Sequence, residues 1–241
     1  MNLFRHLSPH QLALLVFAVY FLIIITDVRH FARHDPGSVF FDPDDAFAHK
    51  YTTVRQQEAE AYIAAAETTE HVKAREGHSM CVGIATVQRD GARYFRDAVG
   101  SVLAGLARQE REDISLVNFI VNIDPTAHQA YNESWLELVS DEVLTYADAD
   151  EATKQRVTDL DLMLENRFVT KPLFDYVYLL QNCYDDGAEW VVMLEDDTLA
   201  ADGWYLRTKE ATAELSRKGR IDNMIYLRLF ENERLLGWNS E

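Results

Sequence analysis

Residues 190–197 read Trp-Val-Val-Met-Leu-Glu-Asp-Asp, an apolar run that ends in three consecutive carboxylates. A short apolar run of this kind, preceded by the turn signal Asp185-Asp186-Gly187, is typical of a strand that is buried on both faces. Three adjacent carboxylates repel one another unless a cation neutralises them. We therefore expect a sheet strand with a ligand site at its carboxyl end, where open α/β sheets bind their ligands.

The rest of the chain supplies further strand and helix patterns around this strand. Four segments have the length and apolar content of buried strands: 80–87, 116–123, 190–194 and 224–230. Two segments space their apolar side chains as on one face of a helix: 94–106 and 173–184. We expect residues 126–150 to be helical at first and then irregular. Because strands alternate with helices, the pattern predicts an α/β fold with right-handed crossovers.

The N-terminal region contains the apolar run Leu-Ala-Leu-Leu-Val-Phe-Ala-Val-Tyr-Phe-Leu-Ile-Ile-Ile at residues 12–25. Arg5 and His6 precede the run, and no small-residue cleavage site follows it. This pattern favours an uncleaved signal anchor, a transmembrane helix within residues 1–28. A cleaved signal peptide and a buried core helix are the alternatives for a run of this length.

The sequence between this run and the first predicted strand is polar. Turn signals occur at 35–37 and 42–45, and residues 50–76 are rich in Ala, Glu, Gln and Arg with sparse apolar positions. We expect residues 29–77 to form a juxtamembrane stem that includes a polar helix. The folded domain is then expected to occupy residues 78–241.

The charge balance excludes one class of function. The chain of 241 residues has 40 acidic and 23 basic side chains, which gives a formal net charge of −17. Nucleic-acid binding requires Lys and Arg to neutralise phosphates, so we expect no nucleic-acid partner. Acidity of this degree fits many soluble and lumenal domains and identifies none of them.

Two features bear on the compartment of the folded domain. Cys81 and Cys183 are the two cysteines of the chain. Two buried free thiols are the favoured interpretation, because unpaired cysteine is among the most buried residue types, and one disulfide is the alternative. The sequon Asn132-Glu133-Ser134 is compatible with a lumenal body, although such tripeptides are common by chance.

The acidic triplet 195–197 is the main candidate for a metal site. Hard oxygen ligands with open coordination positions suit Mn²⁺ or Mg²⁺ that bridges a diphosphate. The alternative is a solvated acidic turn that caps the following helix, because acidic residues are common where loops begin.

Other polar residues are candidates for contacts with a bound phosphate or nucleotide. Arg89 follows the first strand, and its guanidinium is able to bind a diphosphate through two parallel hydrogen bonds. Lys171, just before the helix predicted at 173–184, is a candidate for a phosphate or sugar contact. Asp175 and Tyr176 on that helix are candidates for the nucleotide. Each of these residues also has an ordinary interpretation. Arg89 would be a solvated loop arginine, Lys171 a lysine that flanks a helix, and Asp175 and Tyr176 surface or core residues.

Three stretches carry a resemblance to known proteins: Cys-Val-Gly-Ile-Ala-Thr-Val-Gln-Arg-Asp at 81–90, Lys-Pro-Leu-Phe-Asp-Tyr at 171–176 and Val-Met-Leu-Glu-Asp-Asp at 192–197. In this order they resemble two related groups of glycosyltransferases. One is the N-acetylglucosaminyltransferase IV group, which acts on N-glycans. The other is the post-GPI-attachment N-acetylgalactosaminyltransferase family, including its fungal members. Residues 226–239, which end in Arg-Leu-Leu-Gly-Trp-Asn, resemble the second group more closely, and the resemblance covers roughly residues 78–241.

The resemblance implies a GT-A-type, Rossmann-like glycosyltransferase fold and a UDP-sugar donor, which we expect to be UDP-GalNAc. It implies that Glu195 and Asp197 match the outer positions of an Asp-x-Asp-type motif and hold the Mn²⁺ or Mg²⁺. Thr86 and Val87 are expected to border the uridine. The full set expected to contact the nucleotide-sugar is Thr86, Val87, Arg89, Lys171, Asp175, Glu195 and Asp196.

The resemblance also implies a location and an acceptor. We expect the Golgi membrane rather than the endoplasmic reticulum, with a single N-terminal span, a lumenal body and the mannose core of a protein-attached GPI anchor as acceptor. Family members of this type interrupt the domain with a transmembrane hairpin soon after the segment that matches 234–239, and this chain stops at Glu241. We therefore expect an incomplete domain without the acceptor site, and no catalytic residue is assigned.

Two other functions stay open at this point. An N-glycan-branching N-acetylglucosaminyltransferase would share the fold and differ in its donor sugar. An inactive, truncated protein that binds a partner at the membrane would need neither donor nor metal. A soluble nucleotidyltransferase would share the sheet and the acidic site, but the N-terminal apolar run argues against it.

Overall fold

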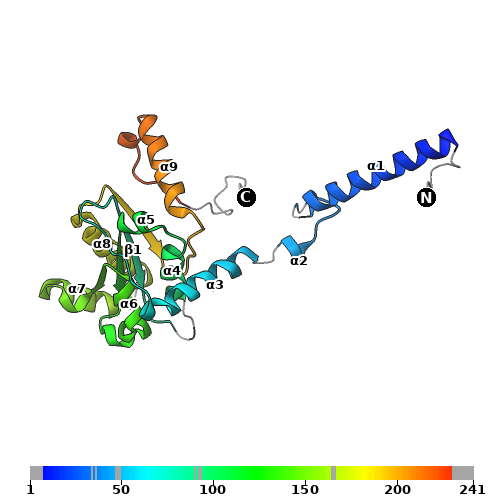
Figure 1. The fold of residues 1–241 in the computed structure, drawn as a ribbon. Helices are drawn as coiled ribbons and strands as arrows, with labels where there is room; N and C mark the ends of the chain where they lie inside the picture. The colour runs from blue at the N-terminus through cyan, green and yellow to red at the C-terminus, as the bar shows by residue number, and fades with distance from the viewer. Residues whose placement is uncertain are drawn as a thin grey trace. The chain divides into compact units, whose positions relative to one another are not determined.

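The structure is a computed structural model that describes residues 8–33, 35, 37–46, 50–89, 91, 94–163 and 167–229. It divides into two units, Met1–Tyr51 and Thr52–Glu241, and each is described by itself (Figure 1). The predictions that fall on Asp90 and on residues 230–241, including the stretch 234–239, lie outside the described residues.

The first unit contains helix α1 (Pro9–Ala32) and the short helix α2 (Pro43–Ala46). Ser8 begins α1 with a capping box, in which its hydroxyl and the side chain of Gln11 bond each other's backbone N–H groups. The 24 residues of α1 make a helix about 36 Å long, enough for a bilayer core of about 30 Å. Within the described residues, α1 is the one helix that is long and apolar enough to cross a membrane. A signal sequence near the N-terminus meets the same criteria.

The second unit is built on a four-stranded parallel sheet. Its strands are β1 (Met80–Thr86), β2 (Ile114–Ile120), β3 (Glu142–Thr145) and β4 (Trp190–Glu195), in the order β3-β2-β1-β4. Thr86 pairs with Ile120, and Ala85 pairs with Glu195, so the carboxyl ends of β1, β2 and β4 lie level with one another. The predicted α/β class is confirmed, with a parallel sheet.

One predicted strand is wrong, and one strand was not predicted. Residues 224–229 form no strand, and Ile225 and Tyr226 are 98% and 68% exposed. The fourth strand is β3, inside the stretch 126–150 that we expected to be helical at first and then irregular. Apolar content alone suggested a strand at 224–229, whereas β3 has four residues and too few apolar positions to show a period.

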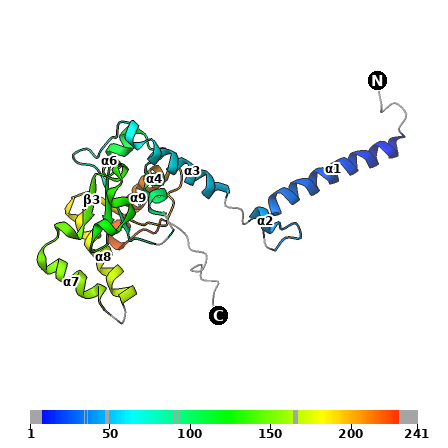
Figure 2. The ribbon, with the colours of Figure 1, turned by 90° about the horizontal axis from the view of Figure 1, so that it is seen from below.

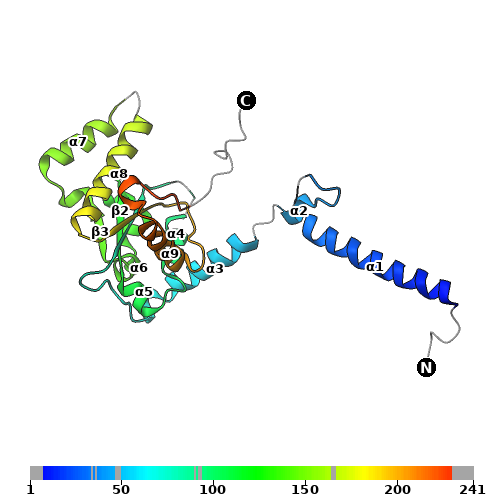
Figure 3. The ribbon, with the colours of Figure 1, turned by 90° about the horizontal axis from the view of Figure 1, so that it is seen from above.

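Helices cover both faces of the sheet, which gives three layers (Figures 2 and 3). One hydrophobic core joins the sheet to α3, α4, α6 and α9, and a second joins it to α7 and α8. The helices of this unit are α3 (Lys50–Ala64), α4 (Tyr94–Leu103), α5 (Arg108–Glu112), α6 (Ser134–Val139), α7 (Glu151–Asp161), α8 (Arg167–Asp185) and α9 (Trp204–Arg217). Single 3₁₀ turns are η1 (Ala66–Thr68), η2 (Pro125–Ala127), η3 (Gln129–Asn132), η4 (Tyr146–Asp148) and η5 (Ile221–Asn223).

The polar helix expected in the stem is α3, and it packs on the folded unit. Buried Arg55 donates hydrogen bonds to the carbonyl oxygens of Ser101 (2.7 Å) and Ala200 (3.1 Å). The backbone of Ala59 passes so close to α4 that a Cβ on Gly100 would lie 2.5 Å from its carbonyl oxygen. The second unit, Thr52–Glu241, thus includes most of this helix, because a few small apolar side chains suffice for a close helix contact.

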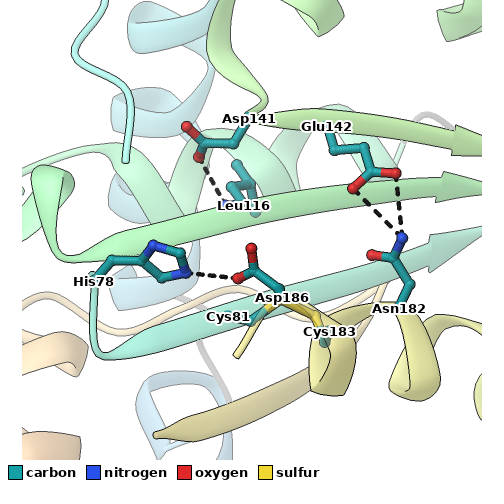
Figure 4. The surroundings of a disulfide bond; sticks show 8 residues. All are labelled: His78, Cys81, Leu116, Asp141, Glu142, Asn182, Cys183 and Asp186. Carbon is teal, nitrogen blue, oxygen red and sulfur yellow. Dashed lines mark hydrogen bonds and ion pairs between the residues drawn. A yellow bond between two sulfur atoms is a disulfide. The ribbon is translucent and has the colours of Figure 1, made fainter. Parts of the chain in front are cut away.

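Cys81 on β1 and Cys183 on α8 form a disulfide, and both residues are fully buried (Figure 4). The favoured prediction of two free thiols is wrong, and the alternative of one disulfide is confirmed. The two residues are 102 positions apart, so only the packing of α8 across β1 reveals the pairing. His78 and Asp186 (2.6 Å) make a second link between the same two segments (Figure 4).

Candidate functional site

Strands β1 and β4 bring Thr86 and Asp196 together at the carboxyl edge of the sheet. Their parallel register sets Ala85 beside Glu195, so the next residue of each strand follows at the same level. The hydroxyl of Thr86 donates to Asp196 Oδ2 over 2.8 Å, and both side chains are buried. Two segments that are 110 residues apart therefore meet through one hydrogen bond.

His128 extends this contact from the segment that follows β2. The backbone N–H of Ala130 donates to His128 Nδ1 (3.2 Å), which leaves the ring proton on Nε2, 3.1 Å from Thr86 Oγ1. Burial lowers the pKa of His128, against the opposite influence of Asp196 and Glu133. Neutral His128 thus donates to Thr86, and Thr86 donates to Asp196.

Arg89 completes what we call the Asp196 group, which consists of Thr86, Arg89, His128 and Asp196. Its guanidinium lies 2.8 Å from Asp196 Oδ1 and 4.0 Å from Asp197 Oδ2. The side chain of Arg89 is 41% exposed, whereas that of Asp196 is 6% exposed. Both oxygens of Asp196 are therefore occupied, while Arg89 keeps an open side toward solvent.

Glu195 and Asp197 stand on either side of this buried carboxylate, and both are exposed. In the part of the chain that the structure describes, no three His, Cys, Asp or Glu side chains are grouped to hold a metal. Mg²⁺ is usually bound through one or two carboxylates plus substrate phosphates and waters. The exposed carboxylates of Glu195 and Asp197, the second of them 4.0 Å from the Arg89 guanidinium, are compatible with that donor set, and their metal role stays a prediction.

A small cavity opens beside the Asp196 group. Its volume of about 30 Å³ is close to the room that one water molecule occupies. Phe95 forms its aromatic wall, with its ring edge-on to His128 at 5.7 Å and 5.9 Å from the Trp135 ring. A nucleotide is far larger than this cavity, so its place would be the exposed surface that Val87 and Arg89 border.

Lys171 and Asp175 lie apart from these residues, on the α7 and α8 side of the sheet. Lys171 Nζ bonds both Asp175 oxygens (3.0 and 2.9 Å) and the carbonyl of Val121 (3.1 Å), which uses its three donors. The Tyr146 hydroxyl donates to Asp175 Oδ1 over 2.6 Å. Tyr176 is about half exposed on the same helix. We call Tyr146, Lys171 and Asp175 the Asp175 group; the structure does not bring it to the Asp196 group.

All three members of the Asp175 group are buried, and their pKa values reflect it. Burial raises the pKa of Asp175, although hydrogen bonds from Tyr146 and Lys171 oppose the change. Burial and the nearby carboxylate raise the pKa of Tyr146. A direct contact of Lys171 or Asp175 with a ligand would require this closed group to open.

A further closed group lies at the amino edge of the sheet, around Asp113. This buried carboxylate accepts hydrogen bonds from Ser79 and from the Tyr205 hydroxyl (2.6 Å), and it pairs with Arg75 (3.2 Å) and Lys209 (3.4 Å). Burial acts to raise the pKa of Asp113, but the hydrogen bonds outweigh it and hold that pKa well below its usual range. These contacts tie α9 to the start of β1.

Comparison with known proteins identifies the family of the chain. Residues 80–241 match the family described as GPI-N-acetylgalactosamine transferase PGAP4. The chain belongs to the PGAP4 family. The match to the PGAP4 family begins at the first residue of β1 and includes every member of the Asp196 group, and it confirms the resemblance drawn from the sequence.

Relatives outside the PGAP4 family support the second resemblance. Mouse alpha-1,3-mannosyl-glycoprotein 4-beta-N-acetylglucosaminyltransferase B is 30% identical over 146 residues, which are 56% of this chain and 26% of that protein. The mouse A enzyme is 25% identical over 154 residues, 59% of this chain and 28% of that protein. The chain thus spans about a quarter of the length of these relatives. No solved structure matches it, and the GT-A type stays a prediction.

Sequence reasoning missed His128 and Tyr146. His128 lies in the irregular segment after β2, 42 residues from the Thr86 that it contacts. The rule that ligands bind at the carboxyl ends of strands points to the segment after β2, which ends at Ile120, but not to His128 in particular. Tyr146 follows β3, and that strand was itself not predicted.

Proposed function

We propose that this chain forms the donor-binding part of a glycosyltransferase that moves N-acetylgalactosamine from UDP-GalNAc to the mannose core of protein-attached GPI anchors. Membership of the PGAP4 family supports the reaction class. The observation that carries the site is the arrangement at the carboxyl edge, where exposed Glu195 and Asp197 flank Asp196, which Thr86 and Arg89 hold in place. A cation and a diphosphate would thus meet two carboxylates and one guanidinium.

Each residue of this edge has a distinct part in the proposal. Asp197 and Glu195 would hold Mn²⁺ or Mg²⁺, which as a Lewis acid stabilises the charge of the departing UDP. Arg89 would exchange its contacts with the two aspartates for the diphosphate, where a guanidinium binds two oxygens at once. Asp196 and Thr86 would keep the strand ends together, and exposed Val87 would border the uridine. We assign no catalytic base to the described residues.

The proposal includes a membrane-anchored protein with a lumenal body in the Golgi. Helix α1 is long and apolar enough to serve as the anchor. The buried Cys81–Cys183 disulfide is typical of oxidising compartments and rare in the cytosol. Both observations agree with a catalytic unit that faces the lumen.

A second candidate is an N-glycan-branching N-acetylglucosaminyltransferase. The observation in its favour is the 30% identity to the mouse B enzyme. The two candidates share the site and differ in the donor sugar that the site prefers. Competition between UDP-GalNAc and UDP-GlcNAc distinguishes them.

Calorimetry of the full chain in detergent, with and without Mn²⁺, tests the donor site. We expect UDP-GalNAc to bind only with Mn²⁺ and Asp197→Ala to abolish that binding while the circular dichroism spectrum stays unchanged. Asp222→Ala, an exposed carboxylate in η5, serves as the matched control and should bind normally. Unchanged binding by Asp197→Ala would refute the metal role. A folded chain that binds no UDP-sugar would favour the non-enzymatic alternative, a membrane-anchored binding protein.

A further inference from the structure

We infer that Asn132 carries an N-linked glycan. The sequence contains one Asn-x-Ser/Thr sequon, Asn132-Glu133-Ser134, in which the middle residue is not proline. The inference rests on the lumenal placement proposed above, and it does not depend on the donor site. Because the chain has a single sequon, it carries either one N-linked glycan or none.

The structure gives Asn132 the surroundings that a glycan needs. Asn132 is the last residue of the 3₁₀ turn η3, and its side chain is exposed. Ala130 and Trp135, on either side of the sequon, are buried in the core. The backbone is thus held from both sides while the Asn132 amide faces solvent, so a bulky glycan fits without displacing the core.

The hydrogen bond of Ser134 in the folded unit indicates that the glycan is attached before folding. Its hydroxyl donates a hydrogen bond to the carboxylate of Glu67, which joins the first turn of α6 to η1. The hydroxyl that defines the sequon is therefore engaged once the unit has folded. Attachment during synthesis, before α6 docks on η1, is the route that leaves this hydroxyl accessible.

The chemistry of attachment is a group transfer. The Asn132 amide nitrogen forms a bond to the anomeric carbon of an oligosaccharide, and the bond from that carbon to a diphosphate leaving group breaks. The amide nitrogen gives up one proton, and the diphosphate carries away the electron pair of the broken bond. The co-reactant is an oligosaccharide diphosphate donor, so the reaction requires the lumen in which the glycosylation machinery acts.

Two features of the molecule independently point to that lumen. The apolar helix α1 has the composition of a segment that directs a chain into a membrane. The disulfide between Cys81 and Cys183 requires an oxidising compartment (Figure 4). A body that forms this disulfide therefore passes through the compartment where its single sequon is read.

The test is expression of the full chain in eukaryotic secretory cells, followed by digestion with a peptide N-glycosidase and electrophoresis. We expect one discrete increase in mobility on digestion of the wild-type chain. Asn132→Gln and Ser134→Ala should migrate like the digested wild type, while Ser134→Thr, which preserves the sequon, should keep the glycan. A wild-type chain whose mobility is unchanged by digestion would overturn the inference.

A reporter variant separates failure of the modification from failure of the placement. The pair Lys218→Asn and Arg220→Thr, in the Asn132→Gln background, creates a sequon around Gly219 at the exposed end of α9. If the reporter is glycosylated and Asn132 is not, the modification is refuted and the lumenal placement stands. If neither is glycosylated, both are refuted. The donor-binding measurement is unaffected by either result.

Discussion

The Asp196 group and the Asp175 group both lie next to strand ends at the carboxyl edge of the sheet, on opposite faces. In the Asp175 group, the Lys171 ammonium donates hydrogen bonds to two carboxylate oxygens and one carbonyl oxygen, and every member is buried. In the Asp196 group, Asp196 is buried, but its partner Arg89 is 41% exposed. Both groups contain a cation beside a carboxylate, yet only the Asp196 group presents its cation to solvent.

This difference separates residues that hold the fold from residues that are able to bind a ligand. A buried charge pair whose hydrogen-bonding groups are all occupied has no donor or acceptor left for a substrate. Removing one partner leaves the other charge buried and uncompensated. A half-exposed pair contributes little to stability and exchanges its partners readily. The two groups should therefore respond oppositely to substitution, with large effects on folding in one and on binding in the other.

The largest effect on the free energy of unfolding is expected from Lys171→Met. The substitution leaves the Asp175 carboxylate buried without its counter-ion, which should destabilise the chain by about 3–5 kcal/mol. Urea denaturation of the full chain in detergent, followed by circular dichroism, measures the change. The double variant Lys171→Met/Asp175→Leu should recover at least half of the loss, because it removes both charges. A loss below about 1 kcal/mol in the single variant would contradict a closed group.

The next effect concerns pH and the closed group around Asp113. Its folded-state pKa is lowered, so below about pH 4 the unfolded chain binds more protons than the folded one. The stability from Asp113 is thus fully present above about pH 4 and is lost as the pH falls through the folded pKa. Urea denaturation at pH 6 and pH 2 should show a loss to which Asp113 contributes about 2 kcal/mol. Asp113→Asn should weaken this dependence; an unchanged pH dependence would exclude Asp113 as its source.

A smaller loss is expected from Thr86→Val in the Asp196 group. Valine keeps the shape of threonine but leaves the His128 N–H and one Asp196 oxygen without their partner. Unpaired buried polar groups of this kind typically destabilise by about 1–3 kcal/mol. Thermal unfolding of the full chain measures the effect, with exposed Thr69→Val as a control. Equal unfolding temperatures of the two variants would mean that the Thr86 hydroxyl does not couple the strand ends.

The smallest effect on folding should come from Arg89→Gln. The side chain is 41% exposed and glutamine keeps an N–H donor for Asp196, so the free energy of unfolding should change by less than about 1 kcal/mol. Because Arg89 is the cation proposed to meet the diphosphate, the affinity for UDP-GalNAc with Mn²⁺ should fall by about tenfold or more. Calorimetry and denaturation of the same sample measure both. A variant that unfolds more easily but binds normally would reverse the roles of the two groups.

Some of this molecule could be predicted from its sequence. The runs at 80–87, 116–123 and 190–194 are long and apolar enough to predict three of the four strands. The rule that open α/β sheets bind ligands at the carboxyl ends of their strands then placed Arg89 and Asp196 at one edge, where the structure has them. Local pattern and parallel topology together thus sufficed for three strands of the sheet and for part of the candidate site.

The rest depended on contacts between segments that are far apart in the chain. Nothing local distinguishes His128 from any other loop histidine, because its role comes from Thr86 across 42 residues. Strand β3 is too short to show a period, and α3 packs on α4 through small residues that gave it the appearance of a stem. The Lys171–Asp175 pair has the i, i+4 spacing of helical ion pairs, which predicts the pairing but not its burial, because Tyr146 and Val121 close the group from distant segments.

The disulfide also joins parts of the chain that are synthesised at different times. Cys81 leaves the ribosome at the start of β1, and Cys183 follows 102 residues later, after β2, β3 and most of α8. Strand β4 emerges last of the four, although it pairs with β1 along the edge opposite β2. Trp190, the first residue of β4, follows Cys183 by only 7 residues, which synthesis at about 5–20 residues per second covers in about a second. Disulfide formation takes seconds or longer, so the strand that carries the acidic turn is synthesised before the bond closes. Oxidation therefore locks a sheet whose ligand-binding edge is already present in the chain.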